Sequence, residues 1–146
     1  MRNLQLWNIR DPENLGPPVD YHEVRGHLRC GTVLITDDTL AGKIQRSEAV
    51  SAEEDVAIRQ AVAEAIVRIG RSTGPTPSRL HYLFWNIFRA CCRESTHCES
   101  CPTACRLPER YAALTAGNRR CLFSAVCASS GMPAKPIEHF AQTDFY

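Results

Sequence analysis

The sequence predicts an all-α domain of about four helices, built around a loop that carries a four-cysteine metal site. Apolar residues recur at helical spacing in three stretches, and a capping residue precedes each of them. Five of the eight cysteines fall between Cys91 and Cys105, which predicts the metal site. A chain of 146 residues has the length of one domain with a modest core.

We divide this single domain into an N-terminal arm at residues 1–18, a helical metal-binding core at 19–127 and a C-terminal tail at 128–146. No run of 18 apolar residues predicts a membrane span, and no apolar signal segment follows Met1. We therefore expect a cytoplasmic protein. In that reducing compartment, clustered cysteines are metal ligands or redox groups more often than disulfides.

The first expected helix follows Asp20, a good N-cap residue, and ends at Gly31. Glu23 stands three residues after Asp20, in the capping-box relation. The expected buried stripe is Tyr21, Val24 and Leu28, with Arg25 and Arg29 on another face. Residues 32–50 are expected to form a loop or one short extended piece.

A second helix is expected from Ser51, with Glu54 completing a capping box, to Ile69, with Gly70 as its stop. A third begins at a Ser78 cap and ends at Cys91. Its apolar stripe is Leu80, Leu83, Phe84, Ile87, Phe88 and Cys91. A fourth helix is expected from Pro108 to about Ala116.

The loop after Cys91 contains Cys98-x2-Cys101, a spacing that places two thiolates on one tight turn. Either Cys91 or Cys92 upstream, with Cys105 downstream, completes a local set of four. Four thiolates suit a tetrahedral zinc ion or an iron–sulfur cluster, and composition alone does not separate the two.

The net charge of +1 conceals an asymmetry between the halves of the chain. Residues 1–70 carry a net charge of −3, whereas residues 71–146 carry +4, and fifteen of the seventeen cations are arginines. Arginine suits forked contacts with phosphate. The asymmetry is compatible with a polyanion partner or with an ordinary solvated face.

Three stretches in this order resemble the iron–sulfur helix-hairpin-helix DNA glycosylases, such as endonuclease III and the adenine glycosylases. The first, Val19-Asp-Tyr-His-Glu-Val-Arg25, is similar to the segment that holds the family's catalytic aspartate. The second is the capped helix 51–69. The third runs from His81 to Cys91 and continues into Cys98-x2-Cys101. The resemblance covers roughly residues 17–105.

The resemblance implies a [4Fe–4S] cluster rather than zinc, held by Cys91, Cys98, Cys101 and Cys105. The arm Cys101-x3-Cys105 is two residues shorter than the family's, so Cys121 or Cys127 is an alternative fourth ligand.

The resemblance also implies a catalytic carboxylate at Asp20, which would stabilise the sugar cation or activate a nucleophile. The alternative is that Asp20 only caps its helix. Arg93, Arg89 and Arg106 would face DNA phosphate, the alternative being simple exposure to solvent.

The family's helix-hairpin-helix has no counterpart, because no Gly-x-Gly occurs in the chain. We therefore expect the cluster lobe of a base-excision DNA glycosylase that binds DNA but does not catalyse alone. A missing lobe or a partner subunit would supply the rest. The alternative is a zinc- or cluster-stabilised protein-interaction module with no role on DNA.

Overall fold

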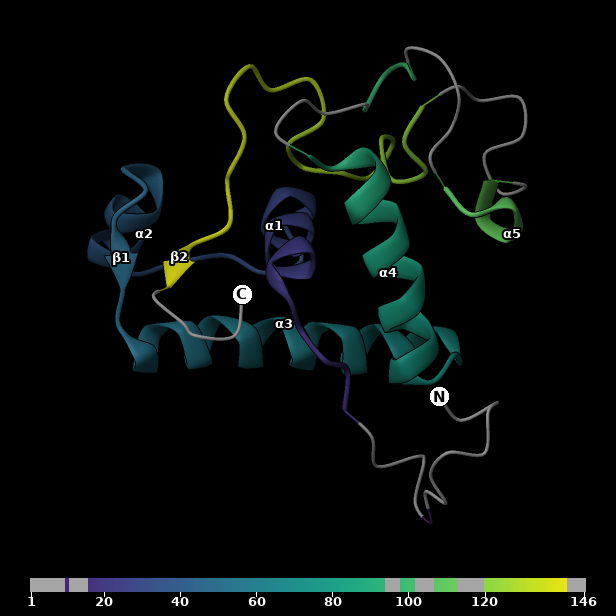
Figure 1. The fold of residues 1–146 in the computed structure, drawn as a ribbon, viewed down its shortest axis with the longest axis horizontal. Helices are drawn as coiled ribbons and strands as arrows, with labels where there is room; N and C mark the ends of the chain where they lie inside the picture. Colours follow the sequence, from purple (N-terminus) through teal and green to yellow (C-terminus); the bar gives the residue numbers. More distant parts are fainter. Residues whose placement is uncertain (1–9, 11–15, 94–97, 102–106, 113–119, 142–146) are drawn as a thin grey trace.

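A computed structural model describes residues 10, 16–93, 98–101, 107–112 and 120–141, and every structural statement below refers to these residues. They contain five helices and one pair of two-residue strands, so the prediction of a mostly helical domain is confirmed (Figure 1). Within those ranges, no helix combines the length and the hydropathy that crossing a bilayer requires.

Helix α1 (Tyr21–Cys30) begins and ends as predicted. Asp20 Oδ1 accepts the backbone N–H of Glu23 at 3.1 Å, and Gly31 closes the helix in the left-handed region at φ 74°. The predicted capping box is only half formed. The Glu23 side chain is fully buried instead, with Oε1 2.9 Å from His81 Nδ1.

The stretch from residue 32 to 50 contains a helix that the sequence analysis missed. Helix α2 (Asp38–Gln45) starts after Asp37, whose side chain accepts the Leu40 N–H at 2.8 Å. Strand β1 (Ala49–Val50) follows it. Helix α2 is short and buries only Ile44, so it offers little hydrophobic periodicity to detect.

Helix α3 (Ala52–Thr73) carries both bonds of the predicted capping box between Ser51 and Glu54. The predicted stop at Gly70 is wrong, since the helix continues to Thr73 and ends at Gly74, where φ is 97°. Gly70 serves packing instead. A Cβ atom there would lie 2.8 Å from the Pro75 carbonyl oxygen.

Helix α4 (Pro77–Cys91) buries most of the predicted stripe, namely Leu80, Phe84, Ile87, Phe88 and Cys91, while Leu83 is only partly buried. Its N-cap is Thr76 rather than Ser78, with Pro77 in the first turn. Helix α5 (Glu109–Ala112) is the start of the predicted fourth helix, whose remainder at 113–116 lies outside the described residues.

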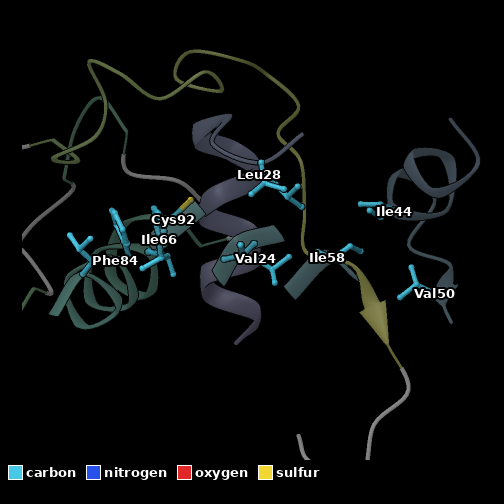
Figure 2. Close-up of a cluster of buried hydrophobic side chains, with 12 residues drawn as sticks. Val24, Leu28, Ile44, Val50, Ile58, Ile66, Phe84 and Cys92 are labelled. Atoms are coloured by element: carbon cyan, nitrogen blue, oxygen red, sulfur yellow. The ribbon is translucent and has the colours of Figure 1, made fainter. Parts of the chain in front are cut away.

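The main core lies where α1 packs against α4 and α3 (Figure 2). Gly26 of α1 faces the Phe88 ring so closely that a Cβ atom would lie 2.1 Å from a ring carbon. A glycine in mid-helix therefore sets the approach of α1 to α4. A second, smaller cluster surrounds the end of α4 and contains Ile87, Ala90, Cys91, Leu107 and Cys121.

The C-terminal segment, yellow in Figure 1, crosses the molecule from the end of α4 to β1. The sequence analysis expected a tail from residue 128, yet Ser129 and His139 are buried and the Ser129 N–H donates to the Arg29 carbonyl at 3.0 Å. Strand β2 (Phe140–Ala141) pairs in parallel with β1. Pro133 and Pro136 make this segment non-helical but leave it ordered against the fold.

Candidate nucleic-acid interface and thiol site

A polar pocket of about 500 Å³ opens beside the last turns of α4 and the start of α1. We call it the arginine pocket, and its lining is Tyr21, His22, Asn86, Arg89, Ala90, Arg93 and Pro108. Two of the three arginines predicted to contact nucleic acid therefore line the same pocket. The third, Arg106, lies outside the described residues.

Arg89 lies in the last turn of α4 and Arg93 lies just beyond its end, and both are exposed. The Arg89 guanidinium stacks over the Trp85 ring, 4.8 Å from its centroid. In the described part of the chain, neither arginine forms an ion pair with a carboxylate.

Asp20, the predicted catalytic carboxylate, lies next to this pocket with both oxygens engaged. Oδ1 caps α1, and Oδ2 accepts the indole N–H of Trp85 at 2.7 Å. The second bond joins the first turn of α1 to the middle of α4. Asp20 thus caps its helix, as the simpler interpretation held, and also anchors the ring on which Arg89 stacks.

His22 lies between the carboxylate and the arginines. Burial lowers the pKa of His22; the charge of Asp20 opposes this, and the charges of Arg25 and Arg89 add to it. Its Nδ1 lies 2.8 Å from an Arg25 guanidinium nitrogen, and its ring meets the Trp85 ring edge-on. A neutral His22 leaves the positive charge of the pocket to the arginines.

Two buried arginines of α1 hold the end of α4, a role that the sequence analysis missed. Arg25 Nε donates to the Cys92 carbonyl at 2.7 Å, and Arg29 donates to the carbonyls of Cys92 and Arg93 at 3.1 and 2.8 Å. Cations at a helix C-terminus are favourable because the last carbonyls carry partial negative charge. The C-terminal segment completes this network, with Glu138 2.5 Å from Arg25 and the Pro136 carbonyl 2.7 Å from Arg29.

Three of the four cysteines predicted as cluster ligands are described: Cys91 is buried at the end of α4, while Cys98 and Cys101 are half-buried. Cys105 lies outside the described residues. Across the described ranges, no three Cys, His, Asp or Glu side chains converge on one point.

Cys121 is distant in sequence from the predicted ligands but lies beside Cys91 and Cys98 in the structure. Its thiol is hydrogen-bonded to that of Cys91, and its N–H donates to the Cys98 carbonyl at 3.2 Å. The bond from Cys91 lowers the pKa of Cys121 to about 7, against the effect of burial, and the backbone N–H groups of Phe123 and Ser124 lower it further. This arrangement favours a thiolate, the form that binds metals.

Cys127, the other alternative ligand, belongs to a separate thiol pair. Its Sγ donates to the Arg29 carbonyl at 3.3 Å, and it is hydrogen-bonded to Cys30. Burial, and then the neighbouring Cys127, raises the pKa of Cys30. Cys30 is therefore a neutral, half-buried thiol that packs against Cys127.

Cys91 and Cys121 share one buried cluster, but a structural zinc ion or an iron–sulfur cluster needs four ligands, and the described residues bring no three together. Comparisons of the chain with protein-family models, with curated proteins and with solved structures find no match. The function must therefore be argued from the pocket and the thiols themselves.

Proposed function

We propose that this chain is a DNA-binding domain that holds backbone phosphate in the arginine pocket and is braced by a [4Fe–4S] cluster on the cysteines that follow α4. The observation that carries the proposal is the pairing of Arg89 and Arg93 on one exposed pocket wall. Two forked cations that line the same pocket suit the oxygen atoms of neighbouring phosphates.

The pocket fits nucleic acid better than a free anion because it also offers an aromatic surface. Tyr21, at 39% exposure, stands on its rim, and the half-buried Trp85 backs Arg89. Aromatic rings and guanidinium planes accept nucleobases by stacking, whereas arginines secure the phosphates. This combination supports a sugar–phosphate chain as the ligand.

Binding rather than catalysis is the role that the Asp20 geometry supports. Its two oxygens already accept hydrogen bonds from Glu23 and Trp85, so a nucleophile or sugar cation would compete with existing donors. Catalysis of base excision would then depend on a second lobe or a partner subunit. When bound, a [4Fe–4S] cluster would tie the cysteine loop into a rigid platform beside the pocket.

The test is salt-dependent binding of labelled duplex DNA, followed by fluorescence anisotropy. Each phosphate contact contributes about −0.9 to the slope of log affinity against log salt. Replacing Arg89 and Arg93 together by alanine should make this slope less negative by about 1.8. The affinity advantage of the wild type should then shrink about 12-fold between about 50 and 200 mM salt.

The matched control is Arg68→Ala with Arg71→Ala, which removes the same charge from exposed positions near the C-terminal end of α3. Because α4 begins close to that end and is 15 residues long, the control site lies about 20 Å from the pocket end of α4. Equal losses of DNA affinity in both double variants would show that net charge, rather than the arginine pocket, causes the effect. A wild-type protein that does not bind DNA would leave the protein-interaction role in its place.

A further inference from the structure

A second pocket, of about 550 Å³, shares no lining residue with the arginine pocket. It opens where the C-terminal segment passes between α1 and α2 (Figure 1). We propose that this pocket binds a carboxylate with an unbranched aliphatic chain, such as a medium-chain fatty acid, and that Lys135 holds the carboxylate. This inference does not depend on the proposed binding of DNA.

The walls of this pocket, which we call the aliphatic pocket, come from separate parts of the chain. Leu28 belongs to α1, Ala41 and Ile44 belong to α2, and Met132 and Ile137 belong to the C-terminal segment. Among the described residues, ten of the twelve that line it are nonpolar, and none of those ten is aromatic. A cavity of this size with mostly apolar walls is typical of a small-molecule site. Without rings for stacking, its walls suit a flexible aliphatic chain better than a flat aromatic ligand.

Two large side chains of the aliphatic pocket remain in contact with water. Leu34 is 74% exposed and Met132 is 49% exposed. A bound aliphatic chain would cover part of both, and the unbranched Met132 side chain can adjust its shape to such a ligand. Each CH₂ group that leaves water for the pocket should raise the affinity up to about fourfold.

Lys135 carries the one charge in the described lining of the aliphatic pocket. Its ammonium donates to the carbonyls of Ser129 and Met132, each at 2.8 Å. An ammonium has three N–H donors, so one remains for a ligand. Over the described ranges, no carboxylate forms an ion pair with Lys135. A single charge with a single remaining donor, already held in place by two bonds, matches a monovalent carboxylate better than a phosphate dianion.

The position of Lys135 suits a ligand that is apolar at one end and charged at the other. Lys135 and Met132 also line a polar pocket of about 310 Å³, together with Cys98, Glu99, Ser100 and Gly131. The ammonium therefore stands where an apolar pocket meets a polar one. The aliphatic chain would lie against the nonpolar walls while the carboxylate keeps its contact with water. Glu99 is exposed, so solvent screens its repulsion of the bound carboxylate.

The test measures the affinity of the full chain for octanoate, decanoate and 1-octanol by titration calorimetry at neutral pH. Decanoate should bind about 15-fold more tightly than octanoate, because it buries two more CH₂ groups. Lys135→Met should weaken octanoate at least fivefold and leave 1-octanol, which has no charge, unchanged. The matched control is Lys43→Met, which removes the other lysine of the chain. The Lys43 ammonium pairs with Glu54 and does not line the aliphatic pocket, so octanoate binding should not change.

A second variant, Ala41→Phe, fills the pocket from α2 and should weaken decanoate at least tenfold, whereas Ala57→Phe at an exposed position of α3 should not. Circular dichroism checks that each variant folds, and Lys135→Met decides alone if Ala41→Phe does not.

A wild-type chain that does not bind decanoate at about 1 mM would overturn the inference. So would an equal loss of octanoate and 1-octanol in Lys135→Met, because the lysine would then only hold the C-terminal segment in place. A wild-type dimer that Ala41→Phe dissociates would assign the pocket to a second copy of the chain and would also overturn it.

Discussion

The close approach of Gly26 to Phe88 predicts that Gly26→Ala destabilises the protein, although alanine is the better helix former. An added Cβ would lie 2.1, 2.2 and 2.4 Å from three ring carbons, whereas touching carbon atoms lie about 3.5–4.0 Å apart. The ring cannot retreat easily, because Phe88 is 2% exposed and packs against the rings of both Phe84 and Phe123.

Two opposing terms decide the size of the effect. Alanine in a helix gains about 1 kcal/mol over glycine, while forcing extra atoms into a packed core costs about 1–3 kcal/mol. With an overlap of more than 1 Å, the cost lies at the upper end. We expect a net loss of about 2 kcal/mol in the free energy of unfolding, measured by urea titration with circular dichroism.

A double-mutant cycle with Phe88→Leu tests the cause. Removing the ring should relieve the overlap, so the double variant should lose at least about 1 kcal/mol less than the two single losses added together. Gly42→Ala is the control, since a Cβ there meets only the flexible Arg46 side chain and should be neutral or slightly stabilising. If Gly26→Ala were as stable as Gly42→Ala, the close approach of α1 to α4 at Gly26 would be wrong.

Two further predictions concern buried ionisable groups of α1. Burial lowers the pKa of His27 to about 4, so its stabilising effect is complete above the unfolded pKa of 6.5 and is lost as the pH falls towards 4. Acidification from about pH 7 to 5 should cost about 2 kcal/mol through this residue, and a His27→Leu variant that kept the wild-type pH slope would contradict the assignment. Replacing Arg29 by methionine should cost about 2–4 kcal/mol, because carbonyls of Cys92, Arg93 and Pro136 lose a buried donor; a loss below about 1 kcal/mol in urea titration would refute this.

The helices could be predicted wherever local chemistry determines them. The Ser51–Glu54 capping box and the apolar stripe that ends at Cys91 act within a few residues, so the sequence displays them directly. Gly70 shows the limit of such signals. A glycine marks a helix end only if no tertiary contact requires it, and here the Pro75 carbonyl requires it within the helix.

The candidate site was harder to predict because long-range contacts assemble it. The resemblance named Arg89, Arg93 and Arg106 together, and the structure places the first two in the lining of one pocket. It could not show that Arg25 and Arg29 are buried, because the carbonyls that they bind lie more than 60 residues away. In the same way, nothing local to Cys121 identifies Cys91 as its neighbour. A charged residue on a predicted helix is expected to face solvent, and only the tertiary structure shows whether it is buried with hydrogen-bonding partners.

The last turn of α4 explains how one short segment can serve both the arginine pocket and the thiol site. Helical geometry directs Arg89 to the solvent and Cys91 to the interior, and Arg93 is exposed just beyond the end of the helix. The turn can hold both orientations because Arg25 and Arg29 satisfy the carbonyls at its end, which would otherwise fray. The two sites therefore share a support but not side chains. Arginine substitutions can therefore test phosphate binding without changing a thiol, because no cysteine lines the arginine pocket.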